Sequence, residues 1–179
     1  TMDSINKNQP EQNHADLFGP QAVEKIRELT KEDSICFFCT ILKQGDPFST
    51  RPMSVQKIDD QGNFWFFSAV DSTKNSEIAR DQAVQMLFQG SKYSDFLSIY
   101  GKAEITKDRA KIDELWEPSV AVWFTEGKDD PRITVIKVTP TDGYYWDTKN
   151  GAAIAMIKRV AGAIVGKTYD DSIEGKVKV

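Results

Sequence analysis

Short runs of apolar residues, some alternating with polar ones, fill the middle of this chain. Runs of this length that are rich in aromatic and β-branched residues, and that are bounded by Gly- and Asp-containing turns, are typical of β-strands. Such strands are predicted at residues 34–42, 48–58, 63–70, 83–89 and 95–106. Because the links between the first three are short, we expect them to form an antiparallel meander.

Helical spacing of apolar residues appears beside these strands. Helices are predicted over residues 20–31, 73–80, 107–116 and 151–165. One further strand is predicted over 133–138 and 144–146, with an irregularity at 140–143, where Pro, Thr, Asp and Gly follow one another. Six short strands with helices at the margins predict a mainly β fold with peripheral α-helices. We expect a small closed barrel, because closure removes exposed strand edges.

The chain has 179 residues, the length of a single domain, and no internal repeat or linker divides it. Residues 1–15 are rich in Asn, Gln, Asp and Lys, so we predict a disordered tail there and one folded domain over residues 16–179. The net charge is −4 without a long basic run, which disfavours nucleic acid as a partner. No apolar run reaches membrane-spanning length and no signal-peptide pattern is present, so we expect a cytoplasmic protein without membrane contact.

Metal-ligating and nucleophilic residues are scarce. Cys36 and Cys39 lie three positions apart on a predicted strand, so their side chains point to opposite faces. The only histidine, His14, lies in the predicted tail. A zinc site needs about four ligands, and a Ser/His or Cys/His nucleophile needs a histidine. We therefore predict neither a metal site nor that type of catalysis.

A candidate phosphate site is predicted where two strands meet a short helix. Arg51 lies on the second strand, and Ser72, Thr73 and Lys74 begin the helix that follows the third strand. A guanidinium, an ammonium and the unpaired N–H groups of a helix start together favour an anion. The alternative is a capped surface helix with solvated Arg51 and Lys74, since Ser and Thr are common N-cap residues.

Aromatic residues also gather late in the chain. They are Trp116, Trp123, Phe124, Tyr144, Tyr145 and Trp146. Aromatic side chains are enriched both in cores and at subunit interfaces. For Trp146 the two interpretations are plain core packing and contact with a bound ring at a subunit interface.

Three short motifs follow one another in the order Arg-Pro-Met at 51–53, Phe-Phe-Ser at 66–68 and Ser-Thr-Lys at 72–74. Their order and spacing resemble the FMN-binding split-barrel proteins related to pyridoxamine 5′-phosphate oxidase. The later stretches 123–131 and 145–147 are similar to the general stress protein 26 branch of that family. The resemblance covers about residues 20 to 166.

The resemblance implies a six-stranded antiparallel split barrel that forms a homodimer with FMN at the subunit interface. It implies that Arg51 and Lys74 bind the FMN phosphate with help from Ser72 and Thr73. The rest of the cofactor would meet a further set of residues. These are the backbone of Pro52, Met53 and Ser54 along the isoalloxazine ring, Phe67 and Ser68 at the ribityl chain and phosphate, and Trp146 from the partner subunit.

Two departures from the oxidase pattern change the expected activity. Gln56 stands where the oxidase has a lysine, and the chain after Trp146 lacks the basic segment with Arg and His that binds the oxidase substrate. We therefore expect an FMN-dependent oxidoreductase of the general stress branch with an unknown substrate, not a pyridoxine-phosphate oxidase. FAD is left open as a replacement for FMN. The alternatives are a flavin-binding or stress-sensing module without turnover, and a binder of a deazaflavin or of another phosphorylated ring such as pyridoxal phosphate.

Overall fold

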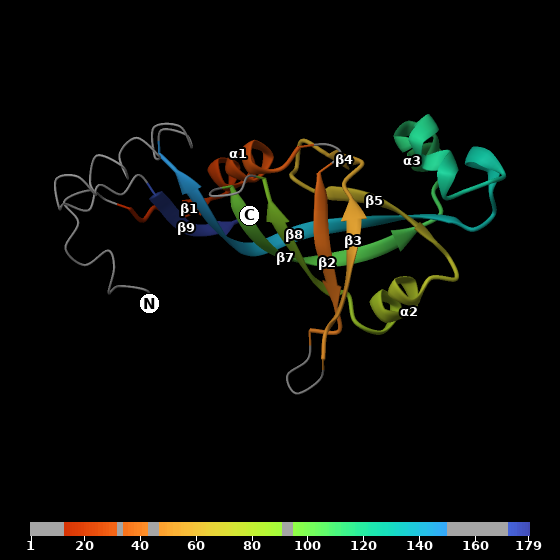
Figure 1. Ribbon diagram of the computed structural model, residues 1–179, viewed down its shortest axis with the longest axis horizontal. Coiled ribbons are helices and arrows are strands. Elements are labelled where there is room, and N and C mark those ends of the chain that lie inside the picture. Colours follow the sequence, from red (N-terminus) through yellow and green to blue (C-terminus); the bar gives the residue numbers. More distant parts are fainter. Residues whose placement is uncertain (1–12, 32–33, 43–46, 91–94, 150–171) are drawn as a thin grey trace, which may run out of the picture.

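The computed structural model of the protein describes residues 13–31, 34–42, 47–90, 95–149 and 172–179. The described residues are organised around one curved β-sheet with short helices at its margins (Figure 1). The strands are β1 (Leu17–Phe18), β2 (Ile35–Thr40), β3 (Ser49–Ser54), β4 (Lys57–Ile58), β5 (Phe64–Ala69), β6 (Ala83–Gln89), β7 (Phe96–Thr106), β8 (Ile133–Thr148) and β9 (Ser172–Lys178). The helices are α1 (Pro20–Leu29), α2 (Thr73–Arg80) and α3 (Arg109–Leu115), with the 3₁₀ helices η1 (Pro118–Val122) and η2 (Gly127–Asp129). None of these described helices is long and apolar enough to cross a membrane.

The strands pair as a split barrel. Among the described residues the sheet has nine strands, in the order β1-β9-β8-β7-β6-β2-β3, while β5 pairs with β4 and with β8. The long strand β8 stays beside β7 but exchanges its other neighbour, because residues 133–138 pair with β5 and residues 143–148 pair with β9. Strand β3 reaches β5 through β4, where the Gln56 N–H donates to the Trp65 carbonyl (2.8 Å). The predicted mainly β split barrel is confirmed, whereas full closure and the count of six strands are wrong.

The additional strands explain the difference in count. The predicted strand 48–58 divides into β3 and β4, and no strand is predicted at β1 or β9. In β9, buried Gly175 and Val177 alternate with exposed Lys176, as expected for a strand. Few of its buried residues are large and apolar, so the sequence pattern is weak. The segment 13–15 lies along β9, where the Ala15 N–H donates to the Glu174 carbonyl (2.9 Å). Residues 1–12 of the predicted tail and the predicted helix 151–165 lie outside the described residues.

Two hydrophobic cores support the sheet. The larger one fills the barrel and includes Phe38, Phe66 and Ile99, all fully buried. The smaller one lies between strands β5 and β8 and the segment that contains α3 and η1. Its buried members are Trp65, Ile112, Leu115, Val120, Phe124, Ile133 and Val135. This second core holds α3 and η1 against the outside of the barrel, where they form a wall beside β5.

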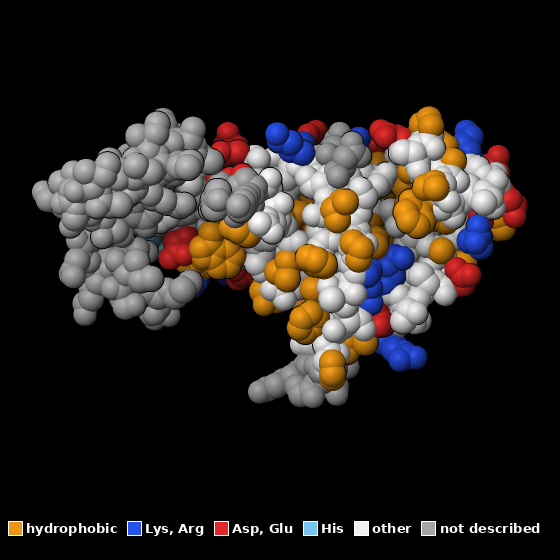
Figure 2. Space-filling model, in the orientation of Figure 1, with side chains coloured by type: hydrophobic (Ala, Val, Ile, Leu, Met, Phe, Trp, Pro, Cys, Tyr) orange, Lys and Arg blue, Asp and Glu red, His pale blue; other side chains and the backbone are white. Residues whose placement is uncertain are grey.

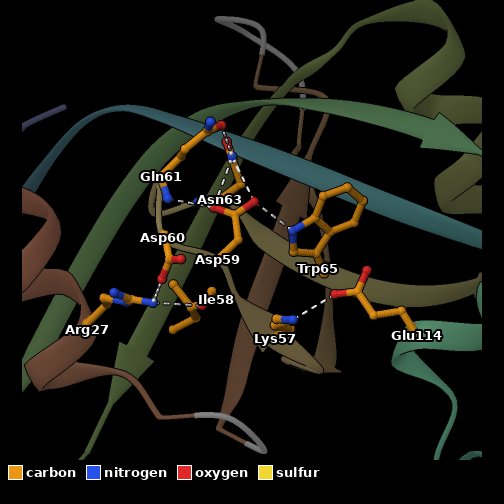
Figure 3. Close-up of polar contacts among 9 residues, drawn as sticks. All are labelled: Arg27, Lys57, Ile58, Asp59, Asp60, Gln61, Asn63, Trp65 and Glu114. Carbon is orange, nitrogen blue, oxygen red and sulfur yellow. Dashed lines mark hydrogen bonds and ion pairs between the residues drawn. The ribbon is translucent and has the colours of Figure 1, made fainter. Parts of the chain in front are cut away.

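The β4–β5 turn ties the same region together (Figure 3). The Asp59 carboxylate accepts hydrogen bonds from the Asn63 N–H (2.9 Å) and from Trp65 Nε1 (3.0 Å). Burial opposes the ionisation of Asp59, but these hydrogen bonds outweigh it, so its pKa lies below the ordinary value. Lys57 pairs with Glu114 of α3 at 2.6 Å. The turn therefore fixes both β5 and α3, the two elements that flank the cavity described next.

Candidate functional site

A cavity of about 480 Å³ opens between strands β3 and β5 on one side and η1 on the other. The residues that line it are mostly apolar or small, and one of them carries a charge. They are Pro52, Met53, Ser54, Gln56, Phe67, Ser68, Ala69, Lys74, Ser119, Val120, Trp123 and Phe124. A concave and largely apolar space of this size, with a few polar groups in its wall, is typical of a small-molecule site.

Helix α2 begins at this cavity, with Lys74 in its first turn. Ser72 is the N-cap, and its Oγ accepts a hydrogen bond from the Asn75 N–H (3.4 Å). Buried Asn75 joins the helix to the sheet, because its side chain accepts from Ser68 Oγ (2.6 Å) and donates to Thr134 Oγ1 (2.9 Å). This network fixes the direction of the first turn, in which the N–H groups of Thr73 and Lys74 have no acceptor within the helix.

Arg51 and Lys74 have different surroundings. Arg51 forms an ion pair with Glu77 of α2, in which Nη2 donates to Oε2 (2.7 Å), and its Nη1 donates to Thr40 Oγ1 (2.7 Å). Lys74 lines the cavity and Arg51 does not. The pKa of Lys74 lies below its ordinary value because burial disfavours the charged ammonium and the positive charge of Arg51 is close. The structure therefore brings the two predicted cations near each other, but presents only Lys74 to the cavity.

Six of the ten predicted contact residues lie in the cavity wall. They are Pro52, Met53, Ser54, Phe67, Ser68 and Lys74. Ser72 and Thr73 lie at the start of α2 beside Lys74, and Thr73 is exposed. Trp146 is not among the described residues that line the cavity. It lies near the end of β8, where its ring centroid is 4.8 Å from that of Tyr144.

The second wall of the cavity is not part of the predicted site. It consists of Ser119, Val120, Trp123 and Phe124. Val120 and Phe124 are buried in the smaller core, whereas Trp123 is 75% exposed at the rim. The sequence places Trp123 and Phe124 in an aromatic group, but it does not show which of the two is buried. That distinction comes from the packing of η1 against the barrel.

Ion pairs hold this second wall in place. The Arg109 guanidinium of α3 donates to the Lys128 carbonyl (2.7 Å) and to Asp129 Oδ1 (2.6 Å). Buried Asp130 accepts hydrogen bonds from the Arg132 guanidinium, at 3.0 and 2.6 Å, and from the Arg132 N–H (3.0 Å). The hydrogen bonds from Arg132 outweigh the effect of burial and lower the pKa of Asp130 to about 2. The charged residues that follow Gly127 therefore shape the wall of the cavity and do not line it.

An apolar patch on the outward face of the sheet adjoins the cavity. Ile35, Phe37 and Leu87 are 67%, 59% and 37% exposed. With Pro52, which also belongs to the cavity wall, they line a hollow of about 360 Å³. Figure 2 shows hydrophobic side chains gathered over β2 and β3, with basic atoms beside them between β3 and α2. We call these four residues the outer patch; it is continuous with the cavity through Pro52.

Trp146 belongs to the same face of the sheet as the outer patch. Phe96 lies in the hollow of the outer patch and pairs across strands with Trp146. Residues directly opposite in an antiparallel pair project to the same side of the sheet. Tyr145, the next residue along β8, is buried on the inward side. The outward face thus carries Trp146 at one end and the rim of the cavity at the other.

The lining of the cavity limits its own chemistry. Its described lining residues include no Asp, Glu, His or Cys. The described part of the chain also contains no group of three or more such residues that could hold a metal ion. Burial raises the pKa of the Cys36 thiol to about 12, which leaves it protonated and unreactive. The cavity can hold an anion beside a flat apolar group, and Lys74 is the one charged side chain among the described residues that line it.

Comparisons with known proteins agree with this fold. A family model described as pyridoxamine 5′-phosphate oxidase like matches residues 21–170. Protein bli-3 of Neurospora crassa is 30% identical over 112 residues, which make up 57% of this chain and 53% of that protein. The chain spans about half the length of the curated relatives it matches.

Two solved structures are similar over most of the chain. A general stress protein 26 from Jannaschia sp. CCS1 has a TM-score of 0.69 and 24% identity, and the match covers 88% of this chain and 95% of that one. A general stress FMN/FAD binding protein from Xanthomonas citri has a TM-score of 0.57 and 26% identity, and the match covers 68% of this chain and 84% of that one. The first likeness shows a shared fold.

Proposed function

Because the chain belongs to the pyridoxamine 5′-phosphate oxidase-like family, in its general stress protein 26 branch, we propose that it is a flavoprotein that binds FMN and acts as an oxidoreductase. The observation that carries this proposal is the cavity that begins at Lys74 and continues between apolar walls. The similar Xanthomonas citri protein, named for FMN/FAD binding, supports a flavin as the ligand.

The residues at the start of α2 fit a phosphate. Lys74 supplies a partly buried ammonium, and the first N–H groups of α2 supply donors that lack acceptors within the helix. Ser68 and Ser72 present hydroxyl groups at the same end, where their Oγ atoms are 3.2 Å apart. These groups would hold the phosphate, and the ordered Asn75 network would keep them in position.

The apolar walls fit a flat ring. Pro52, Met53 and Phe67 lie on the barrel side, and Trp123 and Phe124 lie on the η1 side. These residues would exclude water from both faces of the ring. A bound flavin supplies hydride and electron transfer by itself, so a cavity without Asp, Glu, His or Cys among its described lining residues is compatible with that chemistry.

We also propose that the protein is a homodimer that uses the outer patch as its interface. A second copy would cover Ile35, Phe37 and Leu87, which are too exposed and too close together for an ordinary solvated surface. A twofold contact would involve the same face of both subunits. Since Trp146 lies on that face, the partner's copy of it would approach the cavity rim near Pro52.

The test of flavin binding uses wild-type protein and a variant in which Lys74 is replaced by Met. Purified wild type should be yellow, or should quench the fluorescence of added FMN. Lys74→Met should bind FMN about ten- to a hundredfold more weakly, on the scale of a lost hydrogen bond to a charged group. Riboflavin, which has no phosphate, should bind both proteins equally. Equal FMN affinity in the two proteins would contradict the proposal that Lys74 binds the phosphate.

A second candidate function is flavin binding without turnover. It is favoured by the same lack of acid–base side chains among the described lining residues of the cavity. Steady oxidation of NADH or NADPH by the flavin-loaded protein, in the presence of an added electron acceptor, would support the oxidoreductase. A protein that binds FMN tightly and shows no turnover with either donor would support the binding module.

A further inference from the structure

A buried carboxylate lies directly behind the proposed phosphate site. Glu77 is 7% exposed and stands one helical turn after Lys74 on α2. Its Oε1 accepts from Ser49 Oγ (2.9 Å), and its Oε2 accepts from Thr40 Oγ1 and from Arg51 Nη2 (2.7 Å). Strands β2 and β3 thus supply three donors to one carboxylate of α2.

These donors keep Glu77 charged. Burial alone would raise the pKa of Glu77, but the hydrogen bonds from Thr40, Ser49 and Arg51 outweigh it, and the pKa lies below its ordinary value. At neutral pH the negative charge of Glu77 therefore offsets the positive charge of Arg51. Among the charged side chains Arg51, Lys74 and Glu77, which lie close together here, only Lys74 is left to contribute a net positive charge.

Arg51 still has N–H groups that could bind an anion, even though its positive charge is offset by Glu77. A guanidinium has five N–H groups. Two of them are used by Thr40 and Glu77, and the others make no hydrogen bond to any residue in the part of the chain that the structure describes. The side chain is 22% exposed. An anion at the start of α2 can thus reach Arg51, but it meets a guanidinium whose field is largely cancelled by Glu77.

We propose that Glu77 determines which phosphate charge the site accepts, and that it lets the site take the singly charged phosphate groups of FAD as well as the doubly charged phosphate of FMN. This inference rests on the proposed flavin function. A phosphate monoester carries a charge of about −1.5 to −2 at pH 7 on one phosphate, whereas FAD spreads a similar charge over two linked phosphates, so that only one negative charge lies in the site and the other lies farther from Arg51. Coulomb energy is proportional to the charge of the ligand. An added positive charge therefore favours FMN over FAD, and the offset by Glu77 reduces that preference.

The experiment measures the affinities of riboflavin, FMN and FAD for wild type, Glu77→Gln and the control Glu24→Gln, by quenching of flavin fluorescence at pH 7.5. Glu77→Gln keeps the size of the side chain but removes the charge that offsets Arg51. FMN should bind it about tenfold more tightly than wild type. FAD should gain by a smaller factor, because one of its two negative charges lies farther from Arg51. Riboflavin should be unchanged. Glu24 is an exposed glutamate of α1, so its variant controls for the change in net charge.

The outcomes separate this inference from the proposed function. Wild type that binds none of the three flavins overturns both. Suppose that wild type binds FMN, but Glu77→Gln either changes all three affinities equally or binds FMN more weakly. That result overturns only the role of Glu77. If Glu77→Gln does not fold, wild type alone decides: the inference expects its FMN and FAD affinities to agree within about tenfold, and a preference for FMN above about a hundredfold contradicts it.

Discussion

At the scale of single residues, burial decides what each charged side chain does. The sequence identifies Arg51 and Lys74 as two equivalent cations for a phosphate. The fold brings them close together but gives them different roles, because Arg51 is paired with Glu77 while Lys74 faces the cavity. Glu77 is not noticed in the sequence, since a glutamate on a short amphipathic helix is usually solvated. Only the packing of α2 on β2 and β3 turns it into a buried partner.

Asp130 gives a prediction at this scale. Its pKa of about 2 in the folded protein lies below the ordinary value of 3.8, so the ionised carboxylate contributes stability that is present above pH 3.8 and is lost as the pH falls through 2. The variant Asp130→Asn should therefore be less stable than wild type at pH 7, and the difference should shrink between about pH 4 and pH 2. Urea unfolding across this range measures it.

The control for Asp130 is Asp60→Asn. The Asp60 carboxylate is fully exposed in its ion pair with Arg27, and such pairs contribute little to stability (Figure 3). Its variant should stay close to wild type at every pH. A difference between Asp130→Asn and wild type that persists undiminished at pH 2 would show that Asp130 acts through something other than its ionised form.

At the scale of elements, the cavity depends on two attachments. Helix α2 is attached through Asn75 and Glu77, and the η1–η2 segment is attached through its buried side chains and through Arg109. The first attachment sets the direction of the phosphate donors. The second sets the position of the wall that carries Trp123. Neither attachment is local in sequence, because each joins residues that are far apart along the chain.

Arg109 tests the second attachment. Arg109→Gln should change the free energy of unfolding little, because its ion pairs are exposed and screened by water. It should nevertheless speed amide hydrogen exchange over residues 117–130, which lose the bonds to the Lys128 carbonyl and to Asp129.

The matched control for Arg109 is Arg27→Gln. Arg27 also donates to a backbone carbonyl, that of Ile58 (3.3 Å), and to an aspartate, Asp60 (3.0 Å), but it does so at the β4–β5 turn (Figure 3). Its variant should change exchange near that turn and leave residues 117–130 as in wild type. Unchanged exchange over 117–130 in Arg109→Gln would mean that the buried side chains of η1 hold the wall without help.

At the scale of the whole molecule, the split of the barrel places three features on one continuous surface. The cavity, the outer patch and Trp146 all lie along the outward side of the sheet or at its rim. Exposed apolar side chains that lie together are typical of interaction sites, and the proposed homodimer would cover them. The expected result is a dimer in solution, in which each subunit contributes to the rim of the other's cavity.

The variant Leu87→Asp tests this assembly. A carboxylate at the centre of an apolar interface would be desolvated without a partner, so the variant should be a folded monomer where wild type is a dimer. Light scattering after gel filtration measures the mass. Val179→Asp is the control, because Val179 is exposed to a similar degree (41%) but lies outside the outer patch. A wild type that is monomeric and still binds FMN tightly would contradict the proposed interface.

The sequence alone determined the elements that carry strong local patterns. Helix α2 and strand β6 have the predicted bounds, and β8 has its predicted irregularity at Pro140, where the pairing with β7 shifts between Tyr100 and Gly101. The resemblance carried by the motifs from Arg51 to Lys74 also pointed to residues that line one cavity wall, because those motifs are short and can be read directly from the sequence. Sequence patterns of this kind can be recognised without knowledge of the fold.

Only the tertiary structure decided the rest. Strand β9 gains its place by pairing with β8, the second wall of the cavity comes from η1 packed over the smaller core, and Glu77 meets Arg51 because α2 lies across β2 and β3. Each of these contacts joins segments that are distant along the chain, and burial changes what a side chain does once it is there. Desolvation and long-range packing are properties of the folded chain, so no local pattern of residues contains them.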